Sequence, residues 1–365
     1  MKKALYALVS DQHYHNWSAF STTDVNGLNS RLRIQLDATL EAARAACSAG
    51  ARWFICAGDT FHVRGSLSPT VLYYVKDTYR KIREMGLEII MLAGNHDLES
   101  NDSVMATNAA ATLHEPDFHI HCRPGVGTWA LDDRHKLHMV SWYNNHKELV
   151  ALLKKVGAEA KADSAFSHDV VIHAPINKAI PGMPDVGVEA EDLAGLGFRY
   201  VLSGHYHNHK EVVPGVISIG ALTHHNWGDL GTQAGYMMVY EDGTYAQFET
   251  SAPKFIELEP ETAHPAYVAG NYVRLRAVID NEEEGVKLKL ELAAMKPKGI
   301  ATNFTRRVSM IAGSAATSAT SSIDSLESSV SAFCKMIHDT DGGFELARLT
   351  AECSSILLSA EEVGE

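Results

Sequence analysis

Short apolar runs that end in polar residues recur over positions 4–203 of the chain. They occupy residues 4–9, 53–57, 87–93, 137–141, 169–172 and 200–203. Apolar runs of this length, bounded by polar residues or glycine, are typical of strands buried in a parallel sheet. Apolar residues at helical spacing lie between several of them, at about residues 32–49, 69–85 and 147–162. Strands that alternate with helices in this way predict an α/β fold.

The stretch from Trp53 to Asp97 is the clearest unit of this pattern. It contains two predicted strands joined by the helix predicted at 69–85. A connection of that length suits parallel strands, whose carboxyl ends meet at one edge of a sheet. Asp59 follows the first strand and Asn95 follows the second, so we expect their side chains to lie next to each other. Such an edge is where open α/β sheets hold their active sites.

From residue 212 to residue 249 the pattern changes to short strands separated by turn residues. Asp242-Gly243 lies between the apolar runs 237–240 and 245–248, which is a strong hairpin signal. We expect these antiparallel strands to complete a second sheet. Residues 1–258 are predicted to form one large domain.

The remaining third of the chain predicts smaller parts. A half-buried strand at 273–278, a helix at 285–295 and a return strand at 306–310 predict a small α+β domain at 259–311. Residues 312–322, rich in Ser, Ala, Thr and Gly, are typical of a linker. In the tail, 323–365, apolar residues at helical spacing on both sides of Gly342-Gly343 predict a pair of amphipathic helices.

Composition narrows the classes of protein that remain. No stretch approaches the roughly 20 uninterrupted apolar residues of a membrane span, and the first strand begins directly after Met1-Lys2-Lys3. We therefore expect no signal peptide, no membrane partner and a cytoplasmic location. Five scattered cysteines without a CxxC pair argue against disulfides and against a structural zinc site. The net charge of −13 argues against tight nucleic-acid binding by this chain alone, because phosphate contacts need a basic surface.

Seven residues of metal-binding types stand at the ends of five predicted strands. They are Asp11, His13, Asp59, Asn95, His173, His205 and His207. One histidine after a strand is usually an ordinary core or surface residue, but aspartate and asparagine contribute little to a core, so the joint pattern points to metal binding. Oxygen donors mixed with imidazole suit Mn²⁺, Fe²⁺ or Zn²⁺ better than Ca²⁺. Seven ligands suit two ions about 3.5–4 Å apart, bridged by a carboxylate, which would activate water for in-line attack on phosphorus.

The same residues carry a family resemblance. Asp11-x-His13, Gly58-Asp59, Gly94-Asn95-His96-Asp97, His173 and Gly204-His205-x-His207 resemble, in order, the five signature motifs of the calcineurin-like metallophosphoesterases. The resemblance covers about residues 4–250. It implies a two-sheet αββα sandwich, followed by a small capping domain and a C-terminal helical segment. Residues 58–64, with Ser68-Pro69 after them, resemble the SbcD branch, which comprises nuclease subunits of DNA double-strand-break repair complexes and includes recombination endonuclease subunits of phages.

Carried over position by position, the resemblance implies that Asp59 bridges two ions. Asp11, His13 and His207 then complete the site of a first ion, and Asn95, His173 and His205 complete that of a second ion. Mn²⁺ is the expected metal, with Fe²⁺ or Zn²⁺ as alternatives and Mg²⁺ less favoured. His96 is implied to act at the scissile phosphate, oriented by Asp97.

Two further histidines near these motifs have open roles. His62 matches a second substrate-side histidine of the nuclease branch, and a supporting or surface role is its alternative. Tyr14-His15 stands where many relatives have Leu-Gly, so His15 either crowds or assists the site.

The leading hypothesis is a Mn²⁺-dependent DNA exonuclease or endonuclease that acts as the nuclease subunit of an SbcCD-like complex. Its expected partners are DNA and, through the helical tail, an SbcC-type coiled-coil ATPase. That ATPase or a homodimer would supply the basic surface that this acidic chain lacks. The alternative is another substrate class, a phosphoprotein phosphatase or a cyclic-nucleotide phosphodiesterase, which would share every metal ligand. A binding subunit without catalysis would have lost a ligand or His96, and the sequence retains them all.

Overall fold

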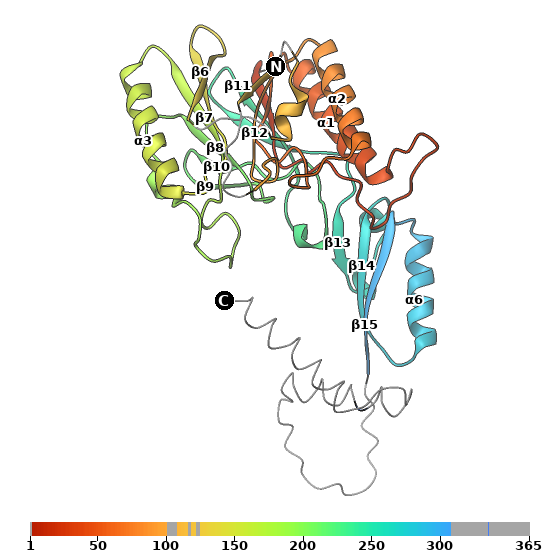
Figure 1. Cartoon of the computed structure of the whole chain (residues 1–365). Helices are drawn as coiled ribbons and strands as arrows, with labels where there is room; N and C mark the ends of the chain where they lie inside the picture. The colour runs from red at the N-terminus through yellow and green to blue at the C-terminus, as the bar shows by residue number, and fades with distance from the viewer. Residues whose placement is uncertain (1, 101–107, 116–117, 122–124, 308–334, 336–365) are drawn as a thin grey trace, which may run out of the picture. The chain divides into compact units, whose positions relative to one another are not determined.

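The computed structural model describes residues 2–100, 108–115, 118–121, 125–307 and 335 (Figure 1). The chain divides at Arg307, and the elements described below belong to the unit Met1–Arg307. The predicted linker at 312–322 lies outside the described residues, and so does the predicted helical tail at 323–365 except for Lys335.

The first sheet has six strands in the order β12-β11-β1-β2-β3-β4. β1 (Ala4–Val9), β2 (Trp53–Cys56), β3 (Glu88–Leu92) and β4 (Phe118–His121) are parallel. β11 (Gly235–Tyr240) and β12 (Tyr245–Glu249) form the predicted hairpin, and β11 pairs antiparallel with β1. The expectation that this hairpin completes the second sheet is therefore wrong. Its partner strand begins at Ala4, more than 200 residues earlier, so no local pattern could reveal the pairing.

The second sheet also has six strands, in the order β5-β6-β7-β8-β10-β9. β6 (His135–Val140), β7 (Ser167–His173), β8 (Tyr200–Gly204) and β10 (Val216–Ser218) are parallel. β5 (Gly127–Ala130) and β9 (Lys210–Val213) are antiparallel strands at its two edges. The ligand-bearing strands thus come from two sheets, three from the first and two from the second.

Successive side chains of each strand point to opposite faces of the sheet, so the core consists of layers. Tyr6 and Leu8 of β1 pack between the two sheets, whereas Ala7 and Val9 face α1 (Ser30–Ser48) and α2 (Pro69–Glu84). α3 (His146–Ala162) packs on the outer face of the second sheet. Figure 1 shows α1 and α2 together on one side of the sheets and α3 on the other. The predicted α/β class and the two-sheet αββα sandwich are confirmed.

The three long helices lie within two residues of their predicted bounds. α1 begins at Ser30 because the side chain of Asn29 accepts hydrogen bonds from the backbone N–H groups of Arg31 and Leu32, at 2.8 and 3.2 Å. α2 has Pro69 at its first position, where a missing N–H costs nothing. The shorter helical segments are η1 (Ala110–Leu113), α4 (Ala190–Leu193), η2 (Trp227–Asp229), η3 (Pro260–Thr262) and α5 (Pro265–Val268).

A third, three-stranded sheet follows the sandwich. β13 (Phe255–Leu258), β14 (Tyr272–Ile279) and β15 (Gly299–Arg306) are parallel, and α6 (Glu282–Ala294) connects the last two. Val268, Val273, Leu275 and Leu292 form its core. A return strand is present, but it begins earlier than predicted: β15 spans Gly299–Arg306, and residues 308–310 of the predicted strand 306–310 lie outside the described residues. The sequence pattern indicates this strand only weakly, because its side chains are polar or only partly buried.

The predicted domain boundary at residue 258 falls after β13, the first strand of this small sheet. None of the helices in the described part of the chain combines the length and the apolar character that crossing a membrane requires.

Candidate metal centre

The two sheets bring the carboxyl ends of five strands together. β1, β2 and β3 of the first sheet lead into the segments that carry Asp11, His13, Asp59 and Asn95. β7 and β8 of the second sheet lead into His173, His205 and His207. All seven residues predicted as ligands are buried or partly buried and lie in one continuous cluster of side chains.

One carboxylate oxygen lies between the two predicted ligand sets. Oδ2 of Asp59 is 3.4 Å from Nε2 of His173 and 3.6 Å from Nε2 of His13. The other oxygen, Oδ1, accepts a hydrogen bond of 2.8 Å from the backbone N–H of His96. This arrangement suits a carboxylate that bridges two ions, as predicted for Asp59.

The remaining side chains divide between two groups around Asp59. On one side, Oδ1 of Asn95 is 3.2 Å from Nε2 of His173 and 3.0 Å from Nδ1 of His205. On the other side, Nε2 of His13 is 3.9 Å from Oδ1 of Asp11 and 3.3 Å from Nε2 of His207. The structure thus brings together Asn95, His173 and His205 on one side of Asp59 and Asp11, His13 and His207 on the other.

The donor atoms have a spacing that fits divalent ions. Ligand atoms about 2.0–2.2 Å from one ion lie about 3–3.5 Å from each other, which is the range of most distances above. The groups Asp59–His173–His205 and Asp11–His13–Asp59 each keep their ligand atoms within 4.8 Å of one another. Gly94 and Gly204 must lack a side chain here, because a Cβ would overlap Asp59 Oδ1 at the first and Ser10 Oγ at the second.

Backbone strain concentrates at these residues. Asp11, His13, Asp59 and His205 have φ angles of 49°, 46°, 50° and 101°, in a region that residues other than glycine seldom adopt. Only three more described non-glycine residues have positive φ, namely Phe20, Lys178 and Lys296. Strain of this kind persists where the surrounding structure holds a functional geometry.

Hydrogen bonds from outside the cluster orient two of the imidazoles. His173 donates from Nδ1 to the backbone oxygen of Ala57 at 2.8 Å, which leaves its Nε2 for an ion. Nδ1 of His207 lies 2.7 Å from Oδ1 of Asp229, whose Oδ2 accepts from the backbone N–H of His225 at 2.6 Å. Asp229, which lies 22 residues after His207, is therefore a supporting residue of the centre.

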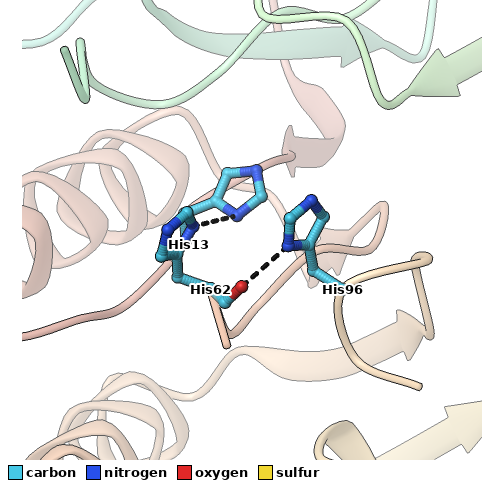
Figure 2. Close-up of side chains that lie close together, drawn as sticks. All are labelled: His13, His62 and His96. Atoms are coloured by element: carbon cyan, nitrogen blue, oxygen red, sulfur yellow. Dashed lines mark hydrogen bonds between the residues drawn. The ribbon is translucent and has the colours of Figure 1, made fainter. Parts of the chain in front are cut away.

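His62 and His96 lie beside His13 (Figure 2). His96 donates from Nδ1 to the backbone oxygen of His62 at 2.7 Å, which keeps its Nε2 available. Nδ1 of His62 is 3.4 Å from Nδ1 of His13, so the side chain of His62 contacts a predicted ligand directly. The three rings form a compact group with centroids 4.8–5.6 Å apart.

Asp97 has a different set of contacts from the one predicted. Its carboxylate accepts from the backbone N–H groups of Gly94, Phe61 and Thr60 at 2.9, 3.0 and 3.3 Å. It thus ties the loop after β3 to the loop after β2. Burial, together with the negative charge of Asp59, raises the pKa of Asp97 to about 7. The ring of His96 is oriented by the carbonyl of His62, whereas Asp97 binds backbone N–H groups of the two loops.

Three other aromatic residues adjoin the first-ion side. The ring of Trp17 lies 4.4 Å from that of His62, and the ring of His15 lies 5.2 Å from it. His225 contacts His13 at 5.1 Å, but its Nε2 donates to the backbone oxygen of Asp11 at 2.9 Å. His225 therefore supports the loop of Asp11, and with His13 and His207 it forms a further group that could hold an ion.

The pKa values favour a neutral imidazole, which can bind an ion, at some positions and a protonated imidazole at others. Burial lowers the pKa of His205 to about 3 and that of His13 well below its usual range, so both are neutral at pH 7. Burial also opposes charge at His173, but Asp59 and Asp11 outweigh it and raise the pKa of His173 to about 9. Burial opposes charge at Asp59 too, yet the neighbouring histidines hold its pKa below the usual range.

Comparison with known proteins extends this picture. A family model described as calcineurin-like phosphoesterase matches residues 6–209, a range that contains all seven predicted ligands together with His62, His96 and Asp97. No curated protein sequence matches the chain. Among solved structures, a dimetal phosphatase from Danio rerio is similar with 10% identity and a TM-score of 0.43, covering 64% of this chain and 91% of that one.

A second solved structure, TT1561 of Thermus thermophilus, is similar with 11% identity and a TM-score of 0.41, covering 68% of this chain and 99% of that one. The family model spans more than half of the 365 residues and coincides with the part of the chain that builds the centre. The chain belongs to the calcineurin-like phosphoesterases, a family of phosphoester hydrolases.

Proposed function

We propose that this chain hydrolyses phosphodiester bonds of DNA with two divalent ions, preferably Mn²⁺, as the nuclease subunit of an SbcCD-like complex. The observation that carries the proposal is the place of His62. The segment 58–64, which resembles the SbcD branch, sets His62 against both His13 and His96 at the edge of the centre. A second histidine next to His96 suits a long, charged diester substrate, because it adds a donor beside the reacting phosphate.

The residues of the chain have separable tasks in this proposal. A bound pair of divalent ions supplies Lewis acidity and a nucleophile derived from water at neutral pH. Asp59, whose Oδ2 lies between His13 and His173, would hold both ions, and the strained loops would fix the other ligands around it. His96, anchored through Nδ1, presents Nε2 as the atom that carries a proton to the leaving oxygen.

The proposed partner is a coiled-coil ATPase of the SbcC type. Two features of the sequence support it, namely the amphipathic pattern at 323–365 and the net charge of −13. An acidic nuclease subunit gains affinity for DNA from a partner, or from a second copy of itself, that contributes basic surface.

A panel of substrates tests the proposed class. The purified chain loaded with Mn²⁺ is expected to degrade linear duplex or single-stranded DNA and to act poorly on p-nitrophenyl phosphate. Asp59→Asn is the control, because loss of the bridging carboxylate removes the centre without changing the size of the side chain. Brisk hydrolysis of the phosphomonoester with none on DNA would instead favour a phosphatase, and preference for a cyclic nucleotide would favour a cyclic-nucleotide phosphodiesterase.

A further inference from the structure

Trp142 lies directly behind the second-ion side of the centre. It follows β6, and only 9% of its surface is exposed. Its backbone N–H donates to the oxygen of Ala93 at 3.1 Å, and its ring packs with Ala93 and Leu98. These two residues flank the segment 94–97, which carries Asn95. Trp142 therefore fixes both ends of the loop that presents one ligand.

The same ring contacts the other two ligands of the second ion. Its centroid is 5.2 Å from that of His205, with the planes tilted by 35°, and 6.2 Å from that of His173. The ring neighbours of His13 are different residues, namely His62, His96, His207 and His225. One indole thus supports the three ligands that serve the second ion alone, and its ring contacts include neither His13 nor His207.

The polar atom of this side chain takes no part in these contacts. Nε1 of Trp142 is buried and has no hydrogen-bond partner among the described residues. A buried donor without a partner is unfavourable, so the value of the residue at this place lies in its ring. The backbone of His205 is strained at φ 101°, and the indole packs against the ring of this strained residue.

We propose that Trp142 is a positioning residue for the second ion, holding Asn95, His173 and His205 in the geometry that binds it. The inference rests on the two-ion centre of the proposed function and on no particular substrate. Metal binding can be measured without DNA, so the inference and the assignment as a nuclease can fail separately.

The test is a titration of the metal-free full chain with Mn²⁺, followed by calorimetry and by the electron paramagnetic resonance signal of coupled Mn²⁺ pairs. Trp142→Ala is expected to weaken the second binding event by about 10–100-fold, as for other changes behind metal ligands, and to abolish the coupled signal. The first event should stay within about twofold of the parent, because its ligands do not touch Trp142. Trp142→Phe keeps a ring and loses only the unpartnered N–H, so it should bind two ions.

A matched control removes a tryptophan from the other side. Trp17 packs against His62, and Trp17→Ala is expected to leave the second binding event unchanged. If Trp142→Ala does not fold, Trp142→Leu replaces it in the same titration.

Four results would overturn the inference. The first is that Trp142→Ala or Trp142→Leu binds both ions with the affinities of the parent, and the second is that both affinities fall equally. The third is that Trp142→Phe fails to bind the second ion, and the fourth is that the parent chain binds one ion only.

Discussion

At the scale of single residues, Asp59 and His173 form a pair that determines the protonation of His173. The pKa of His173 rises to about 9 because Asp59 and Asp11 outweigh the effect of burial. An imidazolium at this position stabilises the metal-free fold fully below about pH 6.5, and this contribution is lost as the pH rises through about 9. An ion needs the neutral ring, so it competes with that proton.

The affinity for Mn²⁺ should therefore depend on pH in a defined range. We expect the apparent affinity to rise between pH 6.5 and 9, by up to about tenfold per pH unit for each displaced proton, and to level off above that range. Titrations of the metal-free chain in buffers of matched ionic strength measure it. An affinity that stays constant from pH 6.5 to 9 would show that His173 is neutral before the metal binds.

The residues that the sequence identifies differ from the others in what positions them. Asp11, Asp59 and Asn95 follow strands whose apolar pattern is strong, and parallel pairing then brings their side chains to one edge. Trp142 acts through packing between segments that are distant in sequence, so no motif indicates it. The contact between His96 and the carbonyl of His62 likewise depends on how two loops meet.

At the scale of secondary-structure elements, a buried polar network joins the two sheets. Asp169 of β7 accepts a hydrogen bond of 2.9 Å from the hydroxyl of Tyr6 of β1 and forms an ion pair with Arg199, which precedes β8. Asp169 is 1% exposed, and burial raises the pKa of the Tyr6 hydroxyl well above its usual value. The network connects the strands that supply ligands from both sheets.

Asp169→Asn tests this connection. Removing the charge leaves Arg199 without its buried counterion, so we expect the free energy of unfolding to fall by about 3 kcal/mol. Urea denaturation of the metal-free chain measures the change. Asp163→Asn, which affects an ion pair with Lys136 at a site 38% exposed, should cost less than about 1 kcal/mol. Equal effects of the two substitutions would argue against a special role for the network.

Elements were predictable where burial is strong and pairing is local. β1 and β2 are apolar along their whole length and β3 is apolar after Glu88, and the helix between β2 and β3 enforces parallel pairing. β15 is mostly exposed or half-buried, and its alternation is too weak to distinguish it from a loop. The turn predicts the hairpin of β11 and β12, but the sheet that the hairpin joins depends on pairing with β1, which the turn does not encode.

At the scale of the whole molecule, the chain divides at Arg307. All the predicted metal ligands and the small sheet precede this point, and the predicted partner-binding segment follows it. The division suggests that metal binding and partner binding can be separated.

A chain that ends at Arg307 should therefore keep its thermal unfolding temperature and its Mn²⁺ content. It should fail to capture a large coiled-coil ATPase, whereas the tagged full-length chain should retain one from cells of the source. Pull-down followed by mass spectrometry provides the comparison. Capture of the same ATPase by both chains would place the partner surface within residues 1–307.

The central claim, that a two-ion centre with His96 as proton donor cuts DNA, is tested most directly by one comparison. Parent and His96→Ala chains with equal Mn²⁺ content are given linear DNA, and the release of nucleotides is followed. We predict degradation by the parent and a loss of about 100-fold or more in the variant, because general acid catalysis contributes at least that factor. A variant that degrades DNA at the rate of the parent, or a parent that does not degrade it at all, would contradict the account.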